Sequence, residues 1–287
     1  MIRIKNKKGC CGCGACAQRC PRKCITMQTD KEGFAYPVVD TKQCTNCGLC
    51  EKVCPVINQQ PERQPIATYA ATNSNETVRE QSSSGGIFTL LAAETINKGG
   101  IVFGAAFNER WAVEHTFADN IDDIKKFRGS KYVQSNIGGS YSVAEKFLKE
   151  GKEVLFSGTP CQIAGLKRFL RKEYKNLKTV DFVCHGVPSP LVWEKYLDEV
   201  CRANDIATIS DIQFRNKAEG WKKFSLQITY RGNDGKERIF RETLNKNLYM
   251  RCFLSDLCLR SSCYSCPARS GKSGSDITLG DLWGAEQ

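Results

Sequence analysis

CCGCGACAQRCP, residues Cys10–Pro21, and CTNCGLCEKVCP, residues Cys44–Pro55, decide how the start of this chain must fold. Aligned from Cys10 and Cys44, both stretches read C-x2-C-x2-C-x3-C-P, offset by 34 residues. An alignment from Cys11 instead gives a C-x1-C spacing that the second stretch lacks. Cys10 is therefore predicted to be a ligand, and Cys11 a spare thiol.

This spacing is typical of bacterial two-cluster ferredoxins, in which the fourth cysteine of each run binds the other cluster. Short gaps let one loop surround three corners of an iron–sulfur cube. The two predicted ligand sets are Cys10, Cys13, Cys16 and Cys54, and Cys44, Cys47, Cys50 and Cys20. Zinc is the alternative, but zinc sites separate their CxxC pairs by longer segments. Cys24 is out of register and is expected to pack beside a cluster.

The segment between the two runs, residues 25–40, alternates in polarity and is predicted to form a hairpin that turns at Lys31–Gly33. With the two runs it makes a 4Fe–4S ferredoxin domain over residues 1–60. A polar, proline-containing linker follows, and a second domain is predicted over residues 66–287.

Composition limits the class of protein. The chain has 287 residues, of which 41% are apolar and 17 are cysteine. It has no apolar run of 18 residues and no signal-peptide core, so we expect a cytoplasmic protein without a membrane span. Tight cysteine clusters in a reducing compartment indicate metal or redox chemistry rather than disulfides.

The formal net charge is +11. Three thiolate-bound 4Fe–4S clusters would reduce it to about +5. No basic-aromatic stripe is present, so we expect no nucleic-acid partner.

The second domain has the pattern of a mixed α/β fold with at least one parallel crossover. Helices are predicted within residues 82–100, 137–152, 160–174 and 189–204. Strands are predicted within residues 66–72, 101–107, 112–118, 153–157, 178–186, 211–216, 223–231 and 236–242, the last three as an antiparallel sheet.

Further cysteines could bind a third cluster. Cys161 lies at a strand-to-helix turn, where a depressed pKa would favour the thiolate, and Cys184 ends the next strand at the same sheet edge. Two ligand sets remain open: a distributed set of Cys161, Cys184, Cys263 and Cys266, and a local set of Cys252, Cys258, Cys263 and Cys266. Zinc in the local set is a third possibility. His185 is a possible ligand or base, although a lone histidine is more often structural.

A Ser- and Gly-rich run, Ser82–Gly86, precedes a predicted helix. Free N–H groups and hydroxyls at a helix start can bind an anion, although such runs are usually only caps. A basic group, Lys125, Lys126, Arg128 and Lys131, could hold phosphates or simply face solvent.

Several fragments together resemble the beta subunit family of coenzyme F-420 hydrogenases and dehydrogenases. They include SSSGGIFTLLA, RGSKYVQS, FSGTPCQIAGLKRFL, DFVCHGVPSP, RSSCYSCP and SDITLGDLWG. The resemblance runs from about residue 66 to residue 284. Family members usually continue further, so we expect either a short member or a truncated gene product.

The resemblance implies a flavin, taken as FAD, with an additional 4Fe–4S cluster beside it. Carried onto this chain, the flavin would border Ser83, Ser84, Gly85, Gly86, Ser130, Lys131 and Tyr132. The resemblance also favours the distributed cysteine set, because Cys252 and Cys258 lie outside the family-like motifs.

The predicted function is an iron–sulfur flavoprotein oxidoreductase. It would pass electrons between a soluble hydride donor, such as a deazaflavin, and a redox partner protein or larger complex. No catalytic residue can be assigned. The alternative is a non-enzymatic electron carrier whose second domain binds no flavin.

Overall fold

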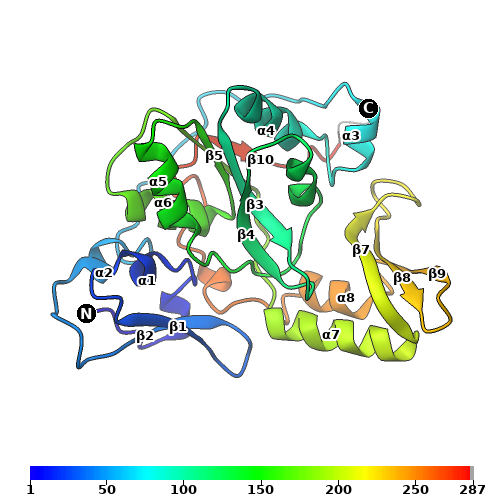
Figure 1. Ribbon diagram of the computed structural model, residues 1–287, viewed down its shortest axis with the longest axis horizontal. Coiled ribbons are helices and arrows are strands. Elements are labelled where there is room, and N and C mark those ends of the chain that lie inside the picture. The colour runs from blue at the N-terminus through cyan, green and yellow to red at the C-terminus, as the bar shows by residue number, and fades with distance from the viewer. Residues whose placement is uncertain (285–287) are drawn as a thin grey trace.

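The computed structural model describes residues 1–284, and it has the mixed α/β fold expected from the sequence. Its strands form a two-stranded, a five-stranded and a three-stranded sheet. In Figure 1 the N-terminal segment lies below α5 and α6, and the three-stranded sheet stands at the opposite side of the molecule. Among residues 1–284, no helix has both the length and the apolar character needed to cross a membrane.

The N-terminal segment is built around the predicted hairpin. Strands β1 (Ile25–Thr29) and β2 (Ala35–Val39) pair antiparallel, which confirms that prediction. The cysteine runs flank the hairpin, and each contains a short helix. The elements outside the hairpin are η1 (Lys7–Gly9), α1 (Ala15–Arg19) and α2 (Leu49–Lys52).

The five-stranded sheet has the order β10-β6-β5-β3-β4, with β4 antiparallel to β3 and the other neighbours parallel. The predicted parallel crossover is therefore confirmed. Its strands are β3 (Ile101–Phe107), β4 (Val113–Ala118), β5 (Val154–Ser157), β6 (Leu177–Phe182) and β10 (Ile277–Leu279). Its covering helices are α4 (Ile87–Asn97), α5 (Ser140–Lys149) and α6 (Pro160–Leu170).

Alternate residues of these strands face opposite layers, as strand geometry requires. Phe103 and Phe156 pack with α5 and α6, whereas Val102 and Leu155 pack with α4. The near-continuous apolar character of β3 and β5 follows from this burial on both faces.

The remaining elements form a second core around the antiparallel sheet, whose predicted pairing is confirmed. They are α7 (Pro190–Ala203), β7 (Ile206–Asn216), β8 (Ser225–Gly232), β9 (Glu237–Thr243) and α8 (Leu248–Leu254). Three short elements lie elsewhere in the chain: α3 (Glu76–Glu80), η2 (Asp123–Phe127), which packs with α4 and β3, and η3 (Cys263–Ser265). Trp193 of α7 lies at the centre of this core, against Phe214 and Tyr249.

The strand predicted over residues 66–72 is wrong, because this segment belongs to no sheet. Its apolar side chains face solvent: Ile66 is fully exposed and Tyr69 is mostly exposed. An apolar alternation forms a strand only where another strand offers hydrogen bonds, and none lies beside this segment.

The hairpin turn docks onto the start of α7. Gly33 adopts a φ of +84°, and a Cβ added there would lie 2.3 Å from Leu191 Cβ and 2.8 Å from Leu191 N. The Ser189 hydroxyl donates a hydrogen bond to the Glu32 carbonyl. A glycine is therefore needed both for the backbone conformation and for the close approach.

We predict that Gly33→Ala lowers the free energy of unfolding by about 1–3 kcal/mol more than Gly99→Ala, because only the first adds an overpacked contact. Gly99 has a similar φ of +71° but no atom within 4 Å of its added Cβ. Denaturant unfolding of both variants measures the difference. Equal losses would show that the docking contact contributes nothing.

Candidate functional site

Two hollows in the N-terminal segment are lined by cysteine sulfurs. One has an empty volume of about 320 Å³ and contains the first predicted ligand set, Cys10, Cys13, Cys16 and Cys54, together with Cys11. The other has an empty volume of about 330 Å³ and contains the second set, Cys20, Cys44, Cys47 and Cys50, together with Cys24. The structure therefore brings each interleaved set together around a space of nearly equal size.

The repeated backbone of the two loops explains this arrangement. Gly14 and Gly48 both adopt a φ of +72° and begin α1 and α2 respectively. This left-handed conformation turns each loop back, so that the cysteine before the glycine and the one inside the helix face the same space. The third ligand cysteine of each run lies on the helix and is buried there: Cys16 on α1 and Cys50 on α2.

Backbone N–H groups point at several of these sulfurs. The Ile2 N–H lies 3.2 Å from Cys50 Sγ, and the Asn46 N–H lies 3.4 Å from Cys44 Sγ. Cys54 accepts from the N–H groups of Val56 and Ile57. Such donors stabilise the thiolate, the form that binds iron.

The crowding of thiols has an electrostatic consequence. Burial, followed by the charges of Cys10 and Cys54, raises the pKa of Cys16 to about 12. Buried neighbouring thiols ionise together only beside compensating positive charge, and an iron–sulfur core supplies it. The residues therefore fit 4Fe–4S clusters. Within residues 1–284, no three His, Cys, Asp or Glu side chains converge closely enough to hold a single metal ion.

The two extra cysteines lie in the walls of the hollows. Cys24 Sγ is 3.4 Å from Cys20 Sγ, and Cys24 is buried. Cys11 is also buried, and its thiol hydrogen-bonds with those of Cys13 and Cys161. The spare thiol thus lies between the N-terminal segment and the central α/β layer.

The distributed cysteine set comes together from three segments. Cys184, which follows β6, lies within electrostatic reach of Cys161, Cys263 and Cys266. These thiols also accept backbone N–H groups: Val187 N is 3.5 Å from Cys263 Sγ. The Gly186 N–H donates a hydrogen bond to the Cys184 sulfur, and the N–H groups of Ala268 and Arg269 donate to the Cys266 sulfur. The donor pattern matches that of the N-terminal loops.

The other two cysteines of the local set behave differently. Cys252 and Cys258 hydrogen-bond with each other. Burial, followed by this hydrogen bond, raises the pKa of Cys258 to about 12. This geometry favours the distributed set over the local one, and the choice of ligands stays a prediction.

The expected depressed pKa of Cys161 is wrong for this arrangement. The hydrogen bond with Cys11 and then burial raise its pKa well above the ordinary value, although Thr159 and Arg260 act in the opposite direction. The helix-start position is as predicted, with Thr159 capping α6. Burial among other thiols outweighs the effect of the helix terminus.

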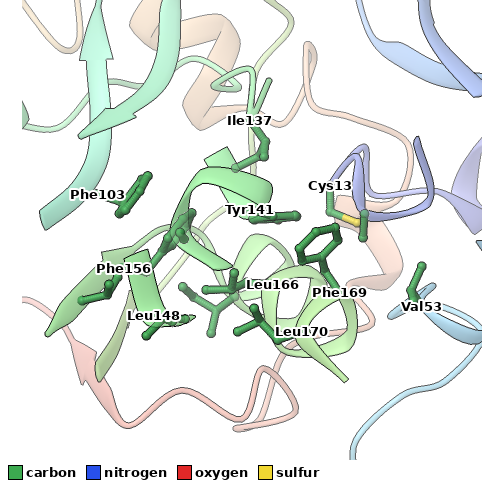
Figure 2. Close-up of a cluster of buried hydrophobic side chains, with 14 of the residues drawn as sticks. Cys13, Val53, Phe103, Ile137, Tyr141, Leu148, Phe156, Leu166, Phe169 and Leu170 are labelled. Carbon is green, nitrogen blue, oxygen red and sulfur yellow. The ribbon is translucent and has the colours of Figure 1, made fainter. Parts of the chain in front are cut away.

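The first cysteine loop packs directly on α6. A Cβ added to Gly165 would lie 2.8 Å from Cys13 Cβ and 2.9 Å from the Tyr141 hydroxyl. Figure 2 shows Cys13 and Val53 of the N-terminal segment beside Phe169 at the edge of the central core. One continuous apolar cluster therefore joins the N-terminal cysteine loops to the central core around α6, where Cys161 lies.

The residues predicted to border a flavin also lie near one another. Ser83 accepts hydrogen bonds from the N–H and the hydroxyl of Ser130, and Gly86 caps α4 with a φ of +79°. Lys131 Nζ donates to the Arg128 carbonyl at 3.0 Å, and burial lowers its pKa to about 8. Ser84, Gly85 and Tyr132 complete the group, with the Tyr132 ring 4.9 Å from that of Phe253.

Two cations at the end of β7, Arg215 within the strand and Lys217 directly after it, reach this group, and neither was predicted from the sequence. Lys217 Nζ lies 3.4 Å from the Ser84 carbonyl oxygen. The Arg215 side chain is only 7% exposed and pairs with Asp281 at 2.7 Å. Its Nε and Nη2 groups are buried without a hydrogen-bond partner in good geometry within residues 1–284, and the Tyr132 hydroxyl lies close enough to interact with the guanidinium. Buried unpartnered donors of this kind suit an anionic ligand.

Of the other predicted candidates, two lysines lie apart from these groups, whereas His185 directly follows Cys184 and its ring lies 4.9 Å from that of Phe253. Lys125 and Lys126 are exposed and interact with Asp122 and with Asp123 and the Phe117 carbonyl. They behave as a solvated face. His185 is partly exposed and pairs with Asp256 at 2.7 Å, which is a structural contact at the surface.

A third missed residue is Arg260, which is fully buried beside Cys10. Its sequence signal is its place three residues before Cys263. Arg260 is the first residue of the family-like fragment RSSCYSCP, whereas Arg215 lies in none of the quoted fragments. The role of either arginine could not be predicted locally, since their partners come from distant segments.

Comparison with known families gives three matches. The model described as coenzyme F420 hydrogenase/dehydrogenase, beta subunit N-term, matches residues 68–139, and the corresponding C terminus model matches residues 151–287. A 4Fe-4S dicluster domain matches residues 9–58. No curated protein sequence matches the chain.

A solved structure is also similar: the xenon derivative of the F420-reducing NiFe hydrogenase complex from Methanosarcina barkeri. The identity is 16%, the TM-score is 0.40, and the alignment covers 65% of each chain. The chain thus spans about two thirds of the length of the protein it is aligned with.

Proposed function

Because this chain belongs to the coenzyme F420 hydrogenase/dehydrogenase beta subunit family and carries a 4Fe–4S dicluster domain in front, we propose that it is an electron-transferring flavoprotein of that type. It would exchange electrons between a soluble hydride donor and a partner protein or larger complex. The observation that carries the proposal is the meeting of Cys161, Cys184, Cys263 and Cys266 beside the N-terminal cluster loop.

The cysteines have a clear role in this proposal. The two interleaved N-terminal sets would hold two clusters, and the distributed set would hold a third. Their backbone N–H donors orient the sulfurs and stabilise the thiolates. Cys13 is buried and Cys161 is only partly exposed, which limits the access of water to the region between the first and third sets and favours electron exchange over side reactions.

The start of α4 and the end of β7 would hold the flavin. Gly86 and the N–H groups of α4 offer a positive helix end, and Arg215 and Lys217 add fixed charge for phosphate groups. A flavin exchanges two electrons with a hydride donor and single electrons with an iron–sulfur cluster. Tyr132 and Ser130 would orient it, as the family resemblance implies.

Anaerobic purification followed by iron and flavin quantitation tests this function. We expect about twelve irons per chain, from three 4Fe–4S clusters, and about one flavin that survives desalting. About eight irons without flavin would establish the simple electron carrier instead. Colourless protein that contains zinc would refute the redox function altogether.

A further inference from the structure

Arg260 is a cation buried where the N-terminal segment meets the rest of the chain, and it is 1% exposed. Its Nε donates to the Cys10 carbonyl at 2.8 Å, and its Nη2 donates to the Ala35 carbonyl at 2.9 Å. Its Nη1 donates to Gln134 Oε1 at 3.0 Å. The guanidinium also lies over the Tyr36 ring, 4.3 Å from its centroid. One side chain thus joins the first cysteine loop, the hairpin and the central layer.

These hydrogen-bond partners are all neutral. Within residues 1–284, no carboxylate forms an ion pair with Arg260. A buried cation without an opposite charge is strongly unfavourable, so the site calls for an anion. The nearest candidate is a thiolate, since Nη2 lies 3.7 Å from Cys10 Sγ.

Arg260 also acts on the distributed set. Its carbonyl accepts a hydrogen bond from the Cys263 N–H at 2.8 Å, and its own N–H donates to the carbonyl of Val187, whose N–H in turn lies 3.5 Å from Cys263 Sγ. It therefore lies within electrostatic reach of ligands from two predicted clusters. No other cation is hydrogen-bonded to Cys10 among the described residues.

The loop is shaped to admit this side chain. Gly12 has a φ of +72°, and a Cβ added there would lie 2.7 Å from Arg260 Nη1. Gln134, which accepts from Arg260, donates in turn to the Cys11 carbonyl at 3.1 Å. Arg260 and Gln134 thus bind two neighbouring carbonyl groups of the first cysteine loop, those of Cys10 and Cys11.

We propose that Arg260 is a positioning residue that fixes the first cysteine loop against the distributed cysteine set and raises the reduction potential of the clusters held there. This inference rests on the proposed function. Reduction adds one negative charge to a cluster, and a fixed buried cation stabilises that charge. Since the first set, rather than the second, meets the distributed set through Cys11, electrons cross between the two regions at the first set.

The test is a redox titration followed by electron paramagnetic resonance on the full-length protein. In Arg260→Met, the ratio of reduced to oxidised cluster at a given potential should fall about tenfold, a downward shift of about 59 mV for a one-electron couple. The cluster of the second set should keep its potential. Arg260→Lys keeps the charge and should show a smaller shift.

A second variant changes the charge without removing the side chain. Gln134→Glu places a carboxylate beside Nη1 and should lower the same potential. The chain offers a matched control pair on the antiparallel sheet, where Arg241 donates to Gln227 at 2.8 Å. Arg241→Met and Gln227→Glu make the same changes in net charge and should leave every cluster potential unchanged.

Unchanged potentials in both Arg260→Met and Gln134→Glu, with full iron content, would overturn the inference. If Arg260→Met does not fold, Gln134→Glu decides alone. Iron content separates this failure from failure of the proposed function. If the wild-type protein contains only about eight irons, it lacks the third cluster. A lower potential of the first cluster in Arg260→Met would then still support the role of Arg260.

Discussion

Cys161→Ala is expected to remove about four irons per chain, the content of one 4Fe–4S cluster. Cys161 lies where the distributed set meets the N-terminal loop, and its thiol interacts with those of Cys11 and Cys184. With one of its four thiolate ligands removed, the cluster is expected to be lost. Iron quantitation on anaerobically purified variant and wild-type protein measures the loss.

Two matched variants sharpen this experiment. Cys201→Ala removes a half-buried thiol of α7 outside every predicted set and should leave the iron content unchanged. Cys252→Ala separates the two ligand sets, because it should also leave iron unchanged if the distributed set binds the cluster. Full iron in Cys161→Ala, or a loss of four in Cys252→Ala, would refute the distributed assignment.

The second large effect concerns the flavin. Arg215→Met should lower flavin content about tenfold or more, because a hydrogen bond to a charged group contributes about 1.5–3 kcal/mol. Arg215 supplies two buried donors, Nε and Nη2, that lack a well-aligned acceptor among residues 1–284, and it lies next to Tyr132 of the predicted flavin-binding group. The measurement is flavin per chain after desalting, with the iron content determined on the same sample.

The control for this variant is Arg241→Met, which removes an arginine from β9 and should keep the flavin. Arg215→Met also leaves Asp281 without its partner, so thermal unfolding of the apoprotein shows whether the fold persists. Wild-type flavin content in a folded Arg215→Met protein would exclude this arginine from flavin binding.

Local pattern was enough to predict most of the secondary structure. The hairpin of β1 and β2, the helix α4 closed by Gly99 and the parallel crossover through β5 and α6 are each encoded by neighbouring residues. The strand predicted at residues 66–72 is not formed, because a strand needs a neighbouring strand to pair with, and the local sequence does not reveal whether one is present. The same limit applies to the flavin-binding group, which was inferred only from family resemblance.

The amino-acid sequence alone determined the mixed α/β class and the pairing of two cysteine runs with equal spacing. Cysteines on one short loop lie close together in space, so the number of residues between them already shows which of them can bind one cluster. Only the tertiary structure showed that the thiols of the distributed set lie within electrostatic reach of one another and where Arg260 and Arg215 lie. Cys161, Cys184 and Cys263 come from separate segments, and the sheet edge, not any spacing along the chain, brings them together. The charge of a buried arginine likewise acts on whichever distant segments fold around it.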